Sequence, residues 1–184
     1  MGANFDNALL FFVNALFELF LWALILRILL QLRRADFYNP FSQMVYQVTR
    51  AVVDPISRVI PKYRRFDIAA FLALLVFTLI YIKLIYWLQG LNVKWVILQF
   101  LWRKIVVMTL NLYTFTLFMQ ALLSWMGPGV HNPAGNILWS LNEPLLRPVR
   151  RWLPPGAIDF SPLVLIFATQ VLARLIGLPG PLNW

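Results

Sequence analysis

The sequence predicts an all-α membrane protein of about four transmembrane helices, arranged as two tandem helix–amphipathic segment–helix repeats. Three observations support this prediction: the composition, four long apolar segments, and an internal repeat. Of the 184 residues, 61% are hydrophobic and only 12% are charged, whereas a soluble domain holds about half apolar and about a quarter charged residues. A water-soluble fold of this length cannot bury so much apolar surface, so lipid must cover part of it.

The four apolar segments run over residues 6–32, 67–89, 105–126 and 160–177. A helix of roughly 20 residues crosses the ~30 Å hydrocarbon layer of a bilayer. Helices are expected rather than open strands, because unpaired backbone amides are costly in lipid. Each segment is therefore predicted to be one membrane span.

The two connectors, 39–61 and 132–154, have helical rather than loop-like patterning. Apolar residues of the first connector recur at i, i+3 and i+4, with polar and basic residues between them. These apolar residues are Met44, Val45, Val48, Val52, Val53, Ile56, Val59 and Ile60. Such a segment is expected to lie in the membrane interface. Pro55 and Pro61 predict two short helices with a bend, and Pro148 predicts the same in the second connector.

A shift of 93 residues superimposes the two connectors. Each apolar residue of the first meets an apolar residue of the second, and the prolines and caps also coincide. The matched pairs are Asn39 with Asn132, Pro40 with Pro133, Pro55 with Pro148, Pro61 with Pro154 and, after one deletion, Asp67 with Asp159. We therefore expect one repeat over residues 1–92 and a second over residues 93–184.

Basic residues concentrate in the connectors, which predicts that both are cytoplasmic and both termini external. The expected location is the inner (plasma) membrane, crossed several times. The net charge of +9 suits anionic lipid headgroups, and no polar basic face with spaced aromatics indicates nucleic acid. The candidate headgroup or partner surface comprises Arg58, Arg64, Arg65, Arg147, Arg150 and Arg151. One interpretation is topology and lipid anchoring; the other is recognition of an acidic partner.

The Asn-Pro pairs fit a helix N-cap followed by proline at the first helical position. Capping alone explains them, and the alternative is that these side chains face a partner or headgroup. The full set of motif positions adds Glu143 to the matched pairs above. Arg27, matched by Gln120, is expected to extend its side chain to the cytoplasmic edge of the membrane.

Glu18 and Lys83 are ionisable residues inside predicted spans, at similar depth, with Asn14 one turn from Glu18. Such groups are functional candidates because unpaired charges in lipid are costly. We expect Glu18 and Lys83 to form an ion pair that fixes helix register. The alternatives are an ion or proton path through Asn14, Glu18 and Lys83, or escape of both charges to an interface.

Few residues could carry enzymatic or cofactor chemistry. The chain has no cysteine and a single histidine, His131, so a zinc site or thiol catalysis is not expected. Non-covalent haem would need more His or Met ligands facing inward than this pattern suggests. We expect no enzyme activity and no cofactor.

The residues of the first half that run from Asp36 to Ser42 (DFYNPFS) resemble the YggT family, also called YlmG. In the second half the similar segments are Leu122–Trp125, Glu143–Pro148, Arg150–Arg151, Leu153–Pro154 and Asp159–Pro162. The sequence departs from the family pattern at Gln120 and Ala157, where arginine and glycine are common. The resemblance covers nearly the whole chain.

The resemblance implies roles in osmotic-stress tolerance and ion homeostasis, or in assembly of membrane systems, without an established catalytic site. A non-enzymatic scaffold or assembly factor is the function that we expect. A channel or transporter component in osmotic ion balance is the alternative. Either role leaves room for a membrane-protein partner or a homo-oligomer.

Overall fold

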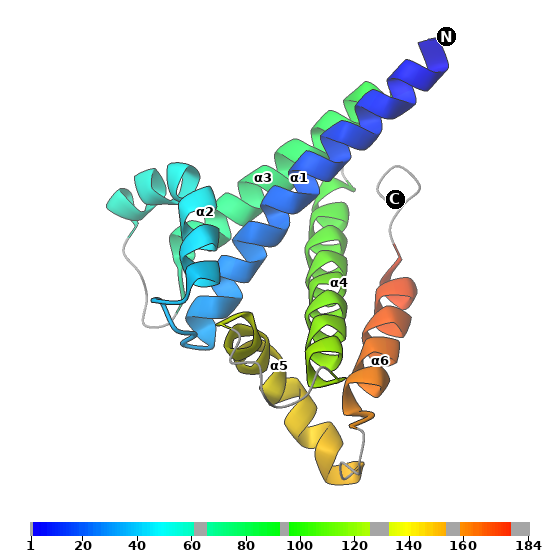
Figure 1. Cartoon of the computed structure of the whole chain (residues 1–184). Coiled ribbons are helices and arrows are strands. Elements are labelled where there is room, and N and C mark those ends of the chain that lie inside the picture. The colour runs from blue at the N-terminus through cyan, green and yellow to red at the C-terminus, as the bar shows by residue number, and fades with distance from the viewer. Residues whose placement is uncertain (1, 61–65, 93–95, 126–132, 154–158, 178–184) are drawn as a thin grey trace.

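The computed structural model describes residues 2–60, 66–92, 96–125, 133–153 and 159–177. These residues form six α-helices (Figure 1). The helices are α1 (Gly2–Leu32), α2 (Pro40–Val59), α3 (Ile68–Leu88), α4 (Ile97–Trp125), α5 (Pro133–Trp152) and α6 (Ser161–Ile176). The all-α class predicted from the sequence is confirmed for the described part of the chain.

Three of the helices are long and apolar enough to cross a membrane: Asn7–Leu32, Ile68–Leu88 and Ile97–Ser124. The apolar helix α6 has 16 residues and is shorter. Large apolar side chains project from these helices instead of packing inside, as with Phe11 and Phe167, each 72% exposed. Exposed apolar surface of this extent requires lipid around it, so the chain is a membrane protein.

Helices α1, α2 and α3 pack together, and α4, α5 and α6 form a second group beside them (Figure 1). The main core lies between α1 and α3, where Leu21, Leu24, Tyr81 and Ile82 are fully buried. A smaller core joins the groups where α1, α2 and α5 meet. There the Asn39 side-chain amide donates a hydrogen bond to the Pro133 carbonyl at 2.6 Å, which ties the start of α2 to the start of α5.

Helix α4 begins at Ile97, eight residues before the predicted start of the third span at position 105. The predicted spans 67–89 and 105–126 left Arg103 and Lys104 in the loop between them. In the structure the helix continues through both residues, because the Lys104 ammonium is buried against the Glu18 carboxylate. A paired charge can lie inside a helix that an unpaired charge would end.

Each connector is one continuous helix, so the predicted division into two short helices at Pro55 and Pro148 is wrong, although α2 changes direction along its length (Figure 1). Helix α2 continues through Pro55, and α5 continues through Pro148. Each proline leaves unbonded the carbonyl four residues before it, which belongs to Ala51 or Pro144, and both of these residues are exposed. Polar surroundings can satisfy such carbonyls. Both helices end two residues before the next proline, and the predicted positions Pro61, Arg64, Arg65, Asn132 and Pro154 lie outside the described residues.

Candidate functional site

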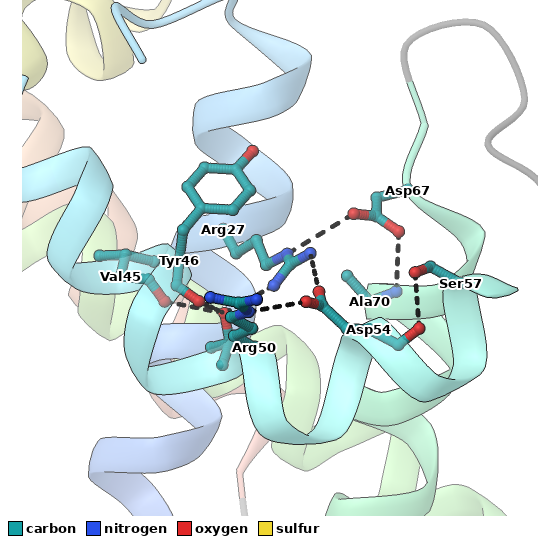
Figure 2. A network of polar contacts seen from close by, with 9 residues as sticks. Arg27, Val45, Tyr46, Arg50, Asp54, Ser57, Asp67 and Ala70 are labelled. Atoms are coloured by element: carbon teal, nitrogen blue, oxygen red, sulfur yellow. Dashed lines mark hydrogen bonds and ion pairs between the residues drawn. The ribbon is translucent and has the colours of Figure 1, made fainter. Parts of the chain in front are cut away.

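Arg27, five residues before the end of α1, is the centre of a polar network with α2 and α3 (Figure 2). Its side chain is only 4% exposed. One terminal nitrogen, Nη1, donates a hydrogen bond to the Thr49 hydroxyl at 3.0 Å. Nη2 lies 3.8 Å from Asp54 Oδ1, and Nε lies 3.5 Å from Asp67 Oδ2. The guanidinium also stacks over the Tyr46 ring, 4.7 Å from its centroid.

The Arg27 side chain is therefore buried between α1, α2 and α3. Burying a lone guanidinium costs several kcal/mol, and opposite charges with hydrogen bonds can offset that cost. Asp67 is held in place because it caps α3, accepting a hydrogen bond from the Ala70 amide at 3.0 Å. The capping role expected for Asp67 therefore coincides with a second role, as a buried counter-ion.

A pocket of about 290 Å³ opens beside the Arg27 network, between α1 and α2. Its lining residues are Arg27, Gln43, Tyr46, Gln47, Arg50 and Asp54. Arg50 is exposed and binds Asp54, with Nε 3.1 Å from Oδ2. A second hollow of about 380 Å³ shares Gln47, Arg50 and Asp54 and extends to Arg58. The two hollows therefore share the polar side of α2, and the buried Arg27 side chain lines the first of them.

The second half of the chain joins its helices through the same positions with different side chains. Gln120 and Asn142 lie 93 residues after Arg27 and Thr49, and Asn142 donates to Gln120 at 2.9 Å. Asn142 is fully buried and also accepts a hydrogen bond from Thr116 at 2.9 Å. The polar link between a span and its connector therefore recurs with neutral side chains instead of a charged one.

In the second half, Arg150 of α5 is the cation that binds the aspartate before the last helix. It binds Glu143 at 2.6 Å and Asp159 at 2.8 Å, and Asp159 accepts a hydrogen bond from the Ser161 amide at the start of α6. Burial alone would raise the pKa of Asp159, but the Ser161 amide and the Arg150 guanidinium outweigh it, so the pKa is lowered. Of the other predicted surface cations, Arg58, Arg147 and Arg151 are exposed.

The intramembrane ion pair forms with a different lysine from the one predicted. Glu18 accepts a hydrogen bond from Lys104 of α4, and the Lys104 ammonium lies 4.9 Å from the centroid of the buried Tyr81 ring. The Tyr81 hydroxyl donates to Asn14 at 2.9 Å. Asn14 and Glu18 thus share one cluster, as predicted, but its other members are Tyr81 and Lys104.

Lys83 lies outside this cluster because of the face of α3 on which it sits. Tyr81, Ile82 and Ile85 are fully buried, whereas Lys83 is exposed, as are Ile80 and Trp87. Lys83 lines a hollow with Trp87 and Gly90 at the end of α3. The predicted pairing of Lys83 with Glu18 is therefore wrong.

Helices α4 and α6 are joined by uncharged polar side chains within their apolar segments. The Thr114 and Thr169 hydroxyls are 2.8 Å apart, and the Gln170 amide donates to Asn111 at 3.2 Å and to Thr114 at 3.0 Å. Interhelical hydrogen bonds of this kind contribute about 0.6 kcal/mol each in membranes. Asn111 occupies the position that corresponds to Glu18, so the second half has a neutral version of the polar cluster.

The sequence interpretation missed Thr49, Asn142, Tyr81 and Lys104. Thr49 and Asn142 could have been found from the sequence. They are polar residues at matched positions of the repeat, and each lies on the same side of its helix as apolar residues. No group of three or more His, Cys, Asp or Glu side chains within the described ranges could hold a metal ion. The polar features that the structure does describe are structural ion pairs, the pocket beside Arg27 and exposed arginines.

Comparison with known proteins places this architecture in a family. The family model described as CCB3/YggT matches residues 6–88 and 98–179. An uncharacterised protein of Pseudomonas aeruginosa is 34% identical over 190 residues, covering 97% of this chain and 96% of the relative. The uncharacterised protein YggT of Escherichia coli K12 is 36% identical, covering 90% of this chain and 87% of the relative. A Haemophilus influenzae protein is 37% identical, covering 90% and 92%.

No solved structure shows significant similarity to the chain. The family match spans most of both halves of the sequence, and the relatives align along nearly their full lengths. The chain belongs to the CCB3/YggT family.

Proposed function

We propose that this chain is a non-enzymatic scaffold or assembly factor of the inner membrane. In this proposal α1, α3, α4 and α6 are four spans, grouped in two tandem units over residues 1–92 and 93–184. Helices α2 and α5 lie on the cytoplasmic surface, and both termini are external. In this proposal the chain binds membrane lipids, and it assembles with another membrane protein or with a second copy of itself.

The observation that supports a scaffold is the rigid attachment of both connectors. Arg27 fixes α2 to α1 through Thr49, and Gln120 fixes α5 to α4 through Asn142. Each connector still presents arginines outward, Arg58 on α2 and Arg147 with Arg151 on α5. Two cationic surfaces held at fixed positions can bind headgroups or an acidic partner without any movement of the spans.

A channel or transporter component in osmotic ion balance is the second candidate, supported by the ionisable pair inside the helix bundle. Lys104 is buried and Glu18 is about one-third exposed, at 34%. An ionisable pair within apolar helices is the kind of feature that ion and proton paths use. The second half has Asn111 at the Glu18 position, and this asymmetry favours the scaffold.

Ion flux in proteoliposomes distinguishes the two candidates. A scaffold should give no more K⁺ or H⁺ flux than empty vesicles, with or without an osmotic gradient. A channel component should raise flux, and Glu18→Gln should change it, whereas the control Glu143→Gln, at the α5 surface, should not. Flux that depends on Glu18 would overturn the scaffold proposal.

A further inference from the structure

The pocket between α1 and α2 has a floor made by a buried cation with unused donors. A guanidinium carries five N–H donors, and Arg27 uses Nη1 for Thr49. Its Nε is buried and faces Asp67 Oδ2 at 3.5 Å, but the 3.8 Å separation of Nη2 from Asp54 Oδ1 exceeds a hydrogen-bond distance, which leaves the Nη2 donors for a ligand. Oxyanions of phosphate and carboxylate groups are the ligands that such a fork binds best.

The rim of the pocket carries both signs of charge. Arg50, 77% exposed, and Asp54, 41% exposed, stand side by side on α2. A simple anion would meet Asp54 as well as the arginines, and a simple cation would meet Arg27 and Arg50. A group with a phosphate at one end and a hydrogen-bonding ammonium at the other matches both signs.

The position of the pocket points to a lipid as the source of that group. Arg27 lies five residues, or ~7.5 Å, from the end of α1. Helix α2, which forms the other wall, exposes Met44 and Val48 on one side and Gln43, Gln47 and Arg50 on another. A helix with an apolar and a polar exposed side lies at headgroup depth, so the pocket faces headgroups.

We propose that the pocket between α1 and α2 binds the phosphoethanolamine headgroup of a membrane lipid, with phosphate at Arg27 and Arg50 and ammonium at Asp54. This inference rests on the interfacial position of α2 in the proposed function. The second half differs at each of these positions, with Gln120, Glu143 and Arg147 in place of Arg27, Arg50 and Asp54. One headgroup site per chain is therefore expected.

The second half also supplies the test variant. Arg27→Gln combined with Thr49→Asn transplants the Gln120–Asn142 pair, which already joins a span to its connector at 2.9 Å. The purified full-length protein would be exposed to equimolar dioleoyl phosphatidylethanolamine, phosphatidylcholine and phosphatidylglycerol, and the retained lipids counted by native mass spectrometry. The wild type should retain phosphatidylethanolamine about tenfold over phosphatidylcholine, whose quaternary ammonium cannot donate to Asp54, a ratio equal to ~1.4 kcal/mol. The double variant should lose this preference.

Two further variants keep the proposal falsifiable if the double variant does not fold. Asp54→Asn removes the acceptor for the ammonium and should abolish discrimination between the ethanolamine and choline lipids. Arg33→Gln removes an exposed charge that does not line the pocket and should leave the preference intact. Equal loss in Arg33→Gln, stronger retention of phosphatidylglycerol, or an unchanged preference in both pocket variants would overturn the proposal.

Soluble O-phosphoethanolamine identifies the source of the ligand. Displacement of the lipid by this compound at equal concentration would overturn the lipid assignment, whereas retention of the lipid would support it. The outcome of the lipid-retention experiment can be told apart from the outcome of the ion-flux experiment that tests the proposed function. Glu18-dependent ion flux with an intact lipid preference refutes the scaffold alone, and absent flux with no preference refutes the pocket alone.

Discussion

Arg27 and Thr49 are joined by a 3.0 Å hydrogen bond that links the end of the first long helix to the middle of the next. The corresponding Gln120 and Asn142 are joined at 2.9 Å. The positive charge that Arg27 brings to Asp67 in the first half is supplied to Asp159 by Arg150 in the second. Both halves therefore have the hydrogen bond between a long helix and its connector. The cation that binds the aspartate lies on the long helix α1 in the first half and on the connector α5 in the second.

Replacing Arg27 with methionine should strongly destabilise the protein, because buried Asp67 would lose the guanidinium that lies 3.5 Å from its carboxylate. The expected loss is ~3–5 kcal/mol, the range for breaking a buried ion pair by removing one partner. Arg27→Gln with Thr49→Asn should recover part of it through the transplanted hydrogen bond. Thermal unfolding in detergent measures both, with Arg33→Met as the control. Equal melting temperatures for wild type and Arg27→Met would refute the buried counter-ion role of Asp67.

Removing one partner of the Glu18–Lys104 pair should cost more than removing both. Lys104→Met leaves the Glu18 carboxylate facing lipid and Tyr81, with an expected loss of ~2–3 kcal/mol. The double change Glu18→Gln with Lys104→Met should be milder, and Lys83→Met should be nearly neutral. Unfolding midpoints in one detergent give the ranking. A larger effect for Lys83→Met than for Lys104→Met would restore the original pairing.

Asn39 has two separable hydrogen bonds. Its oxygen accepts from the Phe41 amide at 3.0 Å, and its amide nitrogen donates to Pro133. Asn39→Asp keeps the cap but removes the donor, so amide hydrogen exchange should rise in the first turn of α5 alone. Asn39→Ala should raise exchange at the starts of both α2 and α5, with ~1 kcal/mol lost from the cap. Identical exchange patterns for the two variants would count against the link to α5.

Asp159 should make stability depend on pH in the acidic range. Its pKa is lowered from 3.8 in the folded state, so the folded protein binds fewer protons than the unfolded chain near that pH. The stabilisation is present above 3.8 and is lost as pH falls through the lowered value. The free energy of unfolding of the wild type should fall as pH drops below about 5, and Asp159→Asn should flatten that part of the dependence. A slope that survives in Asp159→Asn belongs to other carboxylates.

Membrane topology can be tested with fused reporters. Because basic residues concentrate in the connectors, fusions after Arg65 and after Arg151 should both report a cytoplasmic location. Fusions after Trp95 and at Trp184 should report an external one. Connectors found on opposite sides of the membrane would refute the parallel arrangement of the two units.

The sequence predicted the long apolar helices well, because length and hydropathy are local properties. It did not predict which lysine pairs with Glu18. Helix α3 is apolar on all sides, so no periodic pattern distinguishes the buried face of Tyr81 from the exposed face of Lys83. The early start of α4 was missed for a different reason. Lys104 is tolerated inside the helix because it pairs with Glu18 of α1, and the sequence does not show which helices are neighbours.

For the connectors, the position of each helix could be predicted from the sequence, but its continuity through proline could not. Apolar spacing predicted helical connectors over 39–61 and 132–154, and α2 (Pro40–Val59) and α5 (Pro133–Trp152) lie inside those ranges. The predicted break at Pro55 was wrong because the cost of a proline inside a helix depends on whether the carbonyl that it leaves unbonded is exposed. Whether this carbonyl is exposed depends on the tertiary structure. The polar residues Arg50 and Asp54 nearby on α2 do indicate that this side of the helix is exposed.

The unequal lengths of α4 and α6 have a consequence for the surrounding lipid. At ~1.5 Å per residue, the 29-residue α4 and the 16-residue α6 measure ~44 Å and ~24 Å. A hydrogen bond between Thr114 and Thr169 joins the two helices within their apolar segments. As the fourth proposed span, α6 is shorter than the ~30 Å hydrocarbon layer, and each ångström of mismatch costs a fraction of a kcal/mol. Helix α6 therefore fits a thin bilayer better than a thick one, and membrane stretching, which thins the bilayer, would reduce the mismatch of α6.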